Sequence, residues 1–352
     1  MKVAIIGSGV SGLACAYRLN QLGVKPVIFE KKSIIGESID LWGLHLNCFN
    51  TFSSDPLSYF RKKYKLIIKP MDIVNKITMR AGNREINVRG NLGCIFLRGA
   101  DRNSLELQLF NQVNADFFMD TIIKDSLIDD IEKEFDAVVI ATGNLDFTDY
   151  LGLNEENFVF MVRSGIIEGK FKQGKVICWM NMEITNNSYI YLIPINENRA
   201  MLTMLIGNIS QSEVDYYWKR LVLAEDITSD IISTFDCDFH CGKVGVNPYR
   251  NIYFIGNAGG MTDDFAGFGI INGIKSGILA AESIVLGKDF EKSIRPIQNK
   301  VNQLHNLRII SNSLNNRSWQ CLIEIVGFPG VRHAVYKYSL IKYSHLGKLD
   351  GL

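Results

Sequence analysis

Hydrophobic and polar positions near the start of the chain predict a strand, a helix and a second strand. The run Lys2–Ile6 is short and apolar after its first residue, which is typical of a strand buried on both faces. From Leu13 to Leu22 the apolar residues recur at helical spacing, and Gly23 lies where a helix would stop. The next apolar run, "KPVIFE", ends at Glu30.

Three glycines fill the turn between the first strand and the helix in the order G-x-G-x-x-G. In a strand–turn–helix context this spacing predicts a dinucleotide site. Gly7 would make the tight turn, Gly9 would let backbone N–H groups approach a pyrophosphate, and Gly12 would let the helix pack closely on the strand. Glu30 would accept hydrogen bonds from the adenosine ribose, which disfavours a 2′-phosphate and so argues against NADP. A glycine-rich turn in an unrelated α/β protein is the alternative.

A second glycine-rich segment follows another predicted strand, Ile252–Ile255. "GNAGG" comes directly after this strand, and Gly267 and Gly269 then precede a helix rich in small residues. Such a helix packs closely against a flat group or another backbone, and its N-terminus offers unpaired N–H groups. The segment is therefore a second candidate part of a cofactor site.

These two segments, with "CIFLRGADRNSLELQL" and "FDAVVIATGN", resemble the FAD-binding proteins of the p-hydroxybenzoate hydroxylase and geranylgeranyl reductase superfamily. The four motifs occur in the family's order over most of residues 1–285. The resemblance implies FAD as the cofactor. It also implies that Arg98 belongs to the cofactor site, that Asn257 replaces the family's aspartate on the ribityl chain, and that the helix opened by Gly267 and Gly269 meets the flavin edge.

The order of the motifs also implies an interleaved domain organisation. The expected fold class is α/β, with a Rossmann-type FAD-binding domain, an inserted β-sheet substrate domain and a C-terminal helical segment. The expected ranges are 1–50, 92–150 and 245–288 for the FAD-binding domain, 51–91 and 151–244 for the substrate domain, and 289–352 for the helical segment.

Within the inserted part, residues 188–207 predict two strands joined by a hairpin turn at 196–198. "YIYLIP" resembles the Y-x-W-x-F-P of geranylgeranyl reductases and the W-x-W-x-I-P of flavin-dependent halogenases. Strand alternation places Tyr189, Tyr191 and Ile193 on one face, which in the family looks toward the substrate cavity. The alternative is that these side chains simply fill a sheet face.

One departure from the family lies beside the second glycine motif. Asp264 stands where the family has a proline, which in the hydroxylases lines the space where oxygen reacts. An acid at this position makes a monooxygenase or halogenase function less favoured than a reductase function. We expect a neighbour such as Asn272 or Lys275 to hold it, unless it is protonated.

Charge and composition limit the function classes further. The chain has 352 residues with a formal net charge of +1, so no general attraction to nucleic acid is expected. No apolar run is long enough to span a bilayer, and seven cysteines without a repeated spacing indicate reduced thiols in a cytoplasm.

Two further segments were weighed for function. "CDFHC" at 237–241 contains residue types that can ligate a metal ion, but we predict no metal site. Residues 288–352 are rich in Lys, Arg and aromatics, so they form either a solvated helical cap or a peripheral contact with anionic lipid.

Together these features predict an FAD-dependent oxidoreductase that reduces C=C bonds of a hydrophobic, isoprenoid-like substrate by hydride transfer. The sequence contains no second dinucleotide fingerprint, so a nicotinamide, if the enzyme uses one, would have no Rossmann domain of its own. An external reductant, NAD(P)H or a ferredoxin-like donor protein, is expected, and the sequence does not decide between them. The sequence identifies no catalytic residue. The alternatives are a flavin-dependent monooxygenase or halogenase acting on an aromatic substrate, and a non-catalytic FAD-binding protein.

Overall fold

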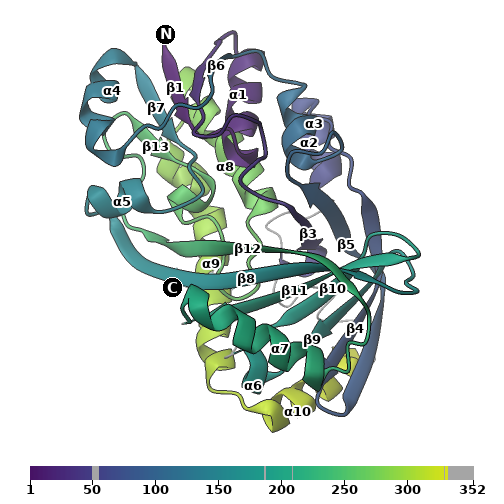
Figure 1. Ribbon diagram of the computed structural model, residues 1–352. Helices are drawn as coiled ribbons and strands as arrows, with labels where there is room; N and C mark the ends of the chain where they lie inside the picture. The colour runs from purple at the N-terminus through teal and green to yellow at the C-terminus, as the bar shows by residue number, and fades with distance from the viewer. Residues whose placement is uncertain (50–54, 186–187, 208, 329, 332–352) are drawn as a thin grey trace.

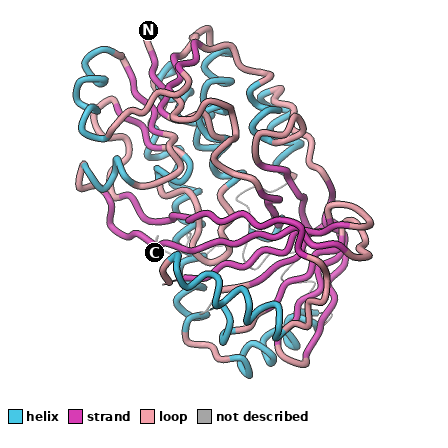
Figure 2. Tube along the Cα trace, viewed as in Figure 1, coloured by secondary structure: helices cyan, strands magenta, loops and turns pink. Residues whose placement is uncertain are grey.

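The computed structural model describes residues 1–352 except 50–54, 186–187, 208, 329 and 332–352. Its strands form two sheets, and its helices lie around and between them (Figures 1 and 2). The smaller sheet contains β1 (Val3–Ile6), β2 (Val27–Phe29), β6 (Asp116–Phe118), β7 (Ala137–Ile140) and β13 (Ile252–Phe254). The larger sheet contains β3 (Leu41–Leu46), β4 (Asp72–Ala81), β5 (Arg84–Arg98), β8 (Asn154–Glu168), β9 (Lys175–Trp179), β10 (Ile190–Pro194), β11 (Arg199–Gly207) and β12 (Ile231–Val244). The helices are α1 (Val10–Gln21), α2 (Pro56–Tyr64), α3 (Leu105–Phe110), α4 (Ile128–Glu134), α5 (Asp146–Tyr150), α6 (Met182–Thr185), α7 (Val214–Ala224), α8 (Ile270–Leu286), α9 (Phe290–Asn312) and α10 (Asn316–Gly327).

The smaller sheet has five parallel strands in the order β13-β7-β1-β2-β6. Ile6 is in register with Phe29 on one side and Ile140 on the other. The carboxyl ends of these strands therefore meet at one edge, which is where doubly wound sheets bind ligands. The strand–helix–strand start expected from the sequence is confirmed, and so is the predicted α/β architecture with a second sheet and C-terminal helices.

Helices α1 and α8 pack closely together on one face of the small sheet. A side chain at Gly277 of α8 would overlap the backbone oxygen of Ser11, and one at Gly12 of α1 would overlap that of Gly7. The small residues of both helices are therefore needed for close approach. On the other face, Ile128 of α4 and Phe147 of α5 pack into a separate core.

The larger sheet has eight strands in the order β12-β8-β11-β10-β9-β4-β5-β3. Strands β10 and β11 form the antiparallel hairpin expected from the sequence. Its turn is closed by Asn196, whose side-chain oxygen accepts hydrogen bonds from the N–H groups of Asn198 (2.8 Å) and Arg199 (2.9 Å). Asparagine favours such a turn because its side chain bonds its own backbone.

At one place, the strands are divided between the two sheets differently from the predicted domain ranges. β3 and the end of β5 pair with each other in the larger sheet, although 1–50 and 92–150 were assigned to the FAD-binding part. Register pairs Leu41 of β3 with Arg98 at the end of β5. The domain boundaries as a whole remain predictions.

The C-terminal helices lie along both parts. Ile294 and Ile297 of α9 pack into the core formed by α1 and α8. Helix α10 lies against β4 and β5 of the larger sheet. No helix in the described part of the chain is long and apolar enough to cross a membrane. Within the basic, aromatic stretch 288–352, residues 329 and 332–352 lie outside the described residues. Lipid contact there remains a prediction.

Candidate functional site

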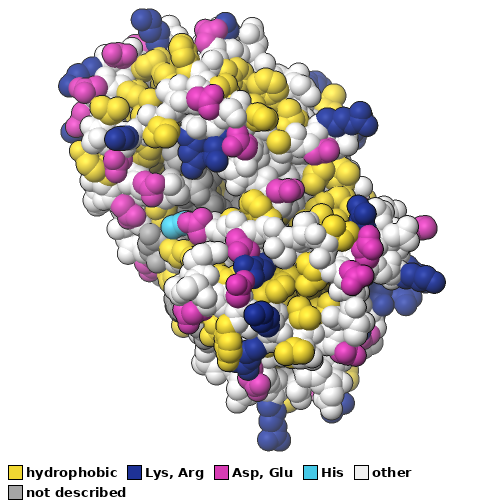
Figure 3. Space-filling model, viewed as in Figure 1, with side chains coloured by type: hydrophobic (Ala, Val, Ile, Leu, Met, Phe, Trp, Pro, Cys, Tyr) yellow, Lys and Arg dark blue, Asp and Glu magenta, His cyan; other side chains and the backbone are white. Residues whose placement is uncertain are grey.

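A cavity of about 930 Å³ lies between the carboxyl edge of the small sheet and the larger sheet. It begins at the glycine loop after β1 and the end of β2, passes the loop 256–269, and continues under β4, β9, β10 and β11 to α9 and α10. The molecular surface is hollowed between the two parts, and Lys/Arg and Asp/Glu side chains are interspersed around the hollow (Figure 3).

The three glycines of the first loop have three different surroundings. Gly7 has φ +104°, and an added Cβ would lie 2.5 Å from the carbonyl oxygen of Ala141. Gly12 allows α1 to pack against the backbone of Gly7, because an added Cβ would lie 2.1 Å from the carbonyl oxygen of Gly7. A Cβ at Gly9 would meet no protein atom within 4 Å, so this position borders open cavity. Gly9 is the N-cap of α1, whose N–H groups and positive dipole end favour a bound phosphate.

Glu30 lies at the end of β2 and lines the same part of the cavity. Its carboxylate accepts hydrogen bonds from the backbone N–H (2.8 Å) and hydroxyl (2.6 Å) of Ser8, and from the N–H of Lys32 (2.9 Å). Only 8% of the residue is exposed. The carboxylate is therefore held in place toward the glycine loop, and Oε1, which accepts only the bond from Lys32, retains acceptor capacity for a ribose hydroxyl.

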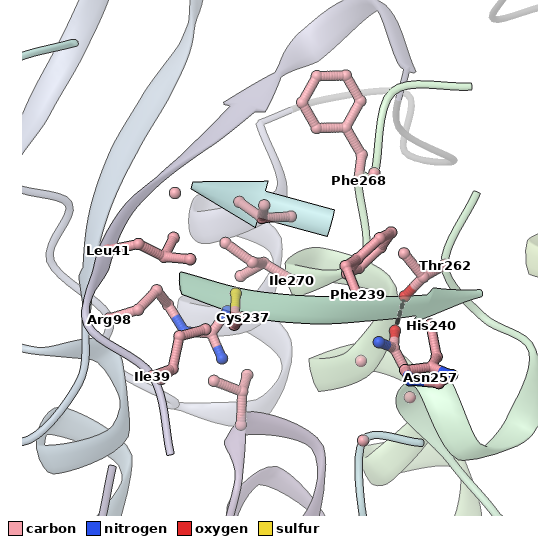
Figure 4. A pocket seen from close by; sticks show the side chains of 18 of the residues that line it. Ile39, Leu41, Arg98, Cys237, Phe239, His240, Asn257, Thr262, Phe268 and Ile270 are labelled. Atoms are coloured by element: carbon pink, nitrogen blue, oxygen red, sulfur yellow. Dashed lines mark hydrogen bonds between the residues drawn. The ribbon is translucent and has the colours of Figure 1, made fainter. Parts of the chain in front are cut away.

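Asn257 lies in the turn after β13 and borders the cavity. Its side-chain oxygen accepts a hydrogen bond from the hydroxyl of Thr262 (Figure 4). A Cβ at Gly269 would overlap that same hydroxyl, so glycine is required where the loop meets α8. The amide nitrogen of Asn257 remains able to donate to a ligand.

The loop that carries Gly267 is organised by Asp263, a residue that the sequence analysis did not assign to the site. Its carboxylate accepts hydrogen bonds from the N–H groups of Ala266 (2.6 Å) and Phe268 (3.0 Å), and the residue is fully buried. Burial raises the pKa of Asp263 to about 6. The sequence signal for this turn was an aspartate four positions before Gly267, since aspartate and glycine are both common in turns.

Arg98 reaches the cavity from the end of β5, where it is paired with Glu106 of α3. Its Nε lies 2.6 Å from one oxygen of Glu106, while the other oxygen accepts from the N–H of Gly99 (3.1 Å). Glu106 is 2% exposed, so it fixes the arginine. The sequence analysis named Arg98 and missed Glu106, which lies eight positions later, in the first turn of α3.

Tyr189 and Tyr191 both line the part of the cavity under the larger sheet. Their ring centres are 6.2 Å apart, and the hydroxyl of Tyr189 donates to the carbonyl oxygen of Ala266. Burial raises the pKa of Tyr191 to about 12 and that of Tyr189 well above its usual value, so both stay neutral. Tyr189 thus connects the larger sheet to the loop before α8. Ile193 is packed into the core on the same strand.

Asp264 is held by His305, a residue from α9, and not by Asn272, one of the two neighbours named from the sequence. Nδ1 of His305 lies 2.9 Å from one carboxylate oxygen of Asp264. The amide of Asn272 donates to the carbonyl of Met261 instead. The second oxygen of Asp264 is buried and has no hydrogen-bond partner among the described residues. The imidazole of His305 also lies 3.9 Å from Glu156.

The segment "CDFHC" forms part of β12, which crosses the cavity. Asp238 and His240 are hydrogen-bonded to each other at 2.7 Å, and Phe239 and His240 lie near Asn257 (Figure 4). Across the described residues, no group of three or more His, Cys, Asp or Glu side chains is arranged to hold a metal ion. His240 is a titratable group in the cavity that the sequence analysis did not select.

Comparisons with known proteins agree with this geometry at the level of fold. Residues 5–54 match a family model described as an NAD(P)-binding Rossmann-like domain. No curated protein matches the sequence. Among solved structures, a geranylgeranyl bacteriochlorophyll reductase-like protein from Thermoplasma acidophilum superposes with a TM-score of 0.72 at 16% identity, covering 97% of both chains.

Two further solved structures have the same fold and different reactions. A flavin-dependent brominase superposes with a TM-score of 0.65 at 14% identity, covering 96% of this chain and 93% of the brominase. A 2-methyl-3-hydroxypyridine-5-carboxylic acid oxygenase superposes with a TM-score of 0.60 at 13% identity, covering 95% of both chains. The chain therefore has the fold of flavin-dependent oxidoreductases, and that fold serves reductases, halogenases and oxygenases.

Proposed function

We propose that this protein is an FAD-dependent oxidoreductase that reduces a C=C bond of a hydrophobic, isoprenoid-like substrate. The observation that carries the proposal is the continuity of the cavity. A cradle suited to a dinucleotide opens, past the loop 263–269, into an apolar space under the larger sheet. One cavity can thus hold a cofactor and an apolar substrate in contact.

The residues of the cradle fit FAD. Gly9 leaves room for the pyrophosphate at the N-terminus of α1, Glu30 faces the ribose position, and Asn257 offers an amide to the ribityl chain. Bound FAD would supply the hydride chemistry. The chain would orient the flavin with the loop 263–269 and exclude water from the substrate with the apolar walls beyond it. NAD(P)H or a donor protein would provide the electrons.

The experiment is to purify the protein, identify its cofactor, reduce it, and incubate it without oxygen with a lipid extract. We expect a yellow protein that releases FAD on denaturation, and a lipid product that has gained two hydrogen atoms. A colourless protein that does not take up FAD would contradict the proposal. A flavin that no reductant bleaches reversibly would favour a non-catalytic FAD-binding protein.

A monooxygenase or halogenase is the second candidate, because structures with those reactions share the fold. Asp264 argues against it, because this carboxylate, which is hydrogen-bonded to His305 of α9, stands at the loop position where the resembling hydroxylases have proline. The discriminating measurement is the reaction of the reduced enzyme with oxygen in the presence of an aromatic substrate. We expect hydrogen peroxide and no oxygenated or halogenated product. An Asp264→Pro variant that acquired such a product would identify this position as the determinant.

A further inference from the structure

One face of α10 forms part of the cavity wall. The residues of α10 that line the cavity recur at helical spacing along one side of the helix: Trp319, Leu322, Ile323 and Val326. All of them are apolar, and Ile323 is 0% exposed. In a surface helix such a stripe usually packs on a core. In α10 the stripe also borders open space, so its side chains can contact a ligand.

Helix α10 lies far from the cofactor cradle. The cavity begins at the glycine loop of the small sheet, whereas α10 lies at the opposite end of the molecule, against β4 and β5 of the larger sheet (Figure 1). Ile77 and Met79 of β4 also line the cavity, so the surroundings of α10 are apolar on that side too. A hydrocarbon chain that extends from the loop 263–269 away from the cradle therefore runs toward α10.

Contacts at both ends of α10 hold it in place. At its start, the side-chain oxygen of Asn316 accepts a hydrogen bond from the backbone N–H of Met182 in α6 (2.8 Å). At its end, Gly327 lies so close to β5 that an added Cβ would be 3.0 Å from a side-chain carbon of Ile86. Because both ends are fixed, α10 cannot move away from the larger sheet without losing these contacts, and it forms a fixed wall.

We propose that α10 is the end wall of the substrate part of the cavity and that Trp319 sets the longest hydrocarbon chain that the cavity accepts. Trp319 has the largest side chain on the lining face of α10, so it fills the most space there. Each methylene group of a ligand that is buried adds to its affinity, whereas a chain that is too long must leave atoms in water or displace packed side chains. This inference rests on the proposed function in so far as the ligand is the enzyme's substrate.

The test measures affinity along a series of prenyl alcohols that differ by one isoprene unit: geraniol, farnesol, geranylgeraniol and geranylfarnesol. Binding of each tritium-labelled alcohol to the purified protein, with the cofactor it retains, is measured by equilibrium dialysis below the critical micelle concentration. We expect the affinity to rise with each added unit up to a limit and not beyond it, because the apolar space ends at α10.

Variants on both faces of α10 locate the limit. Trp319→Ala should bind the first alcohol beyond the limit at least about tenfold more tightly, since each methylene group that becomes buried adds about fourfold to the affinity (about 0.8 kcal/mol). Val326→Trp should move the limit to a shorter alcohol. Ile325→Ala is the matched control, because Ile325 lies on the same helix, is 51% exposed and is not among the described residues that line the cavity. It should leave the limit unchanged.

An affinity that still rises at the longest alcohol would overturn the inference, and so would a Trp319→Ala protein that binds every alcohol equally more weakly. If Trp319→Ala does not fold, Trp319→Phe and Val326→Trp decide: a shift of the limit in either supports the inference, and no shift in both contradicts it. Because dialysis needs no turnover, the two proposals can fail separately. A yellow, reducible protein whose limit does not depend on α10 would overturn this inference alone. A protein that takes up no FAD but whose limit moves with Trp319 would overturn the proposed function alone.

Discussion

At the scale of single residues, the first glycine loop shows that one motif contains positions with different requirements. Gly7 and Gly12 are needed for the fold, since a side chain at either would overlap the backbone of a neighbouring turn. Gly9 has no such restriction and faces the cavity. Of these three glycines, therefore, only Gly9 can be substituted to test ligand binding without disturbing the fold.

Replacing Gly9 with valine should abolish FAD binding while the protein still folds, because the branched side chain fills cavity space and its Cβ has no protein atom within 4 Å. Flavin content and the circular-dichroism spectrum measure the two effects. Gly12→Val is the control and should fail to fold, since its side chain would overlap the backbone of Gly7. A Gly9→Val protein with normal flavin content would mean that the loop is only a turn.

Asp263 provides a second test at this scale. Its pKa in the folded protein is about 6, above the ordinary 3.8, because burial disfavours the charged form. The folded state therefore binds the proton more tightly, so this group stabilises the fold most below pH 4, and its contribution is lost as the pH rises through 6. The loss is about 3 kcal/mol at 1.36 kcal/mol per pKa unit.

We expect the free energy of unfolding of Asp263→Asn to depend less on pH between 4 and 6 than that of the unmodified protein. Urea denaturation at several pH values in this window gives the comparison. The nearby Asp264 is present in both proteins, so the difference isolates Asp263. Identical pH dependence in the two proteins would show that Asp263 does not titrate there.

At the scale of elements, the pair Asp264 and His305 joins the loop before α8 to the middle of α9. α9 also packs on the core of α1 and α8, so the hydrogen bond fixes a loop that the helix already adjoins. Asp264 is 6% exposed, and removal of its partner would leave a buried carboxyl group poorly satisfied.

A double-mutant cycle of Asp264→Asn and His305→Ala should give a coupling energy of about 1–3 kcal/mol in denaturant unfolding. Glu156→Gln is the comparison, since Glu156 lies 3.9 Å from the imidazole with its side chain 42% exposed and should contribute less than about 1 kcal/mol. Strictly additive effects of the two principal substitutions would contradict this linkage.

At the scale of the whole molecule, the cavity belongs to both sheets. Its cradle is built at the carboxyl edge of the parallel sheet, while Tyr189 and Tyr191 reach it from the larger one. A ligand that fills it contacts both parts, and binding energy then stabilises them together.

We therefore expect FAD to raise the melting temperature of the apoprotein in a single transition. At a free FAD concentration one hundred times Kd, the gain is about 2.7 kcal/mol. Hydrogen exchange should show added protection in β1 and β7 of the small sheet and also in β10 and β11 of the larger one. Protection confined to the small sheet would mean that the cofactor does not reach the loop before α8.

The sequence by itself determined the features that depend on neighbouring residues. The opening strand, helix and strand, the hairpin closed by Asn196 and the small-residue helix α8 follow from apolar periodicity and from the backbone freedom of glycine and asparagine. These features depend on interactions between residues that are close in the sequence, so a short stretch of sequence is enough to predict them. The order of the motifs then indicated the two-part α/β architecture.

Only the tertiary structure decided which distant side chains meet. His305 reaches Asp264 across 41 positions, and Arg308 enters the cavity because α9 turns back along α8 and the larger sheet. The pairing of β3 with β5 likewise placed 41–46 in the larger sheet. Such contacts depend on how packed elements are oriented, and a buried charge on a helix has the same local pattern whether it faces solvent, a core or a cavity.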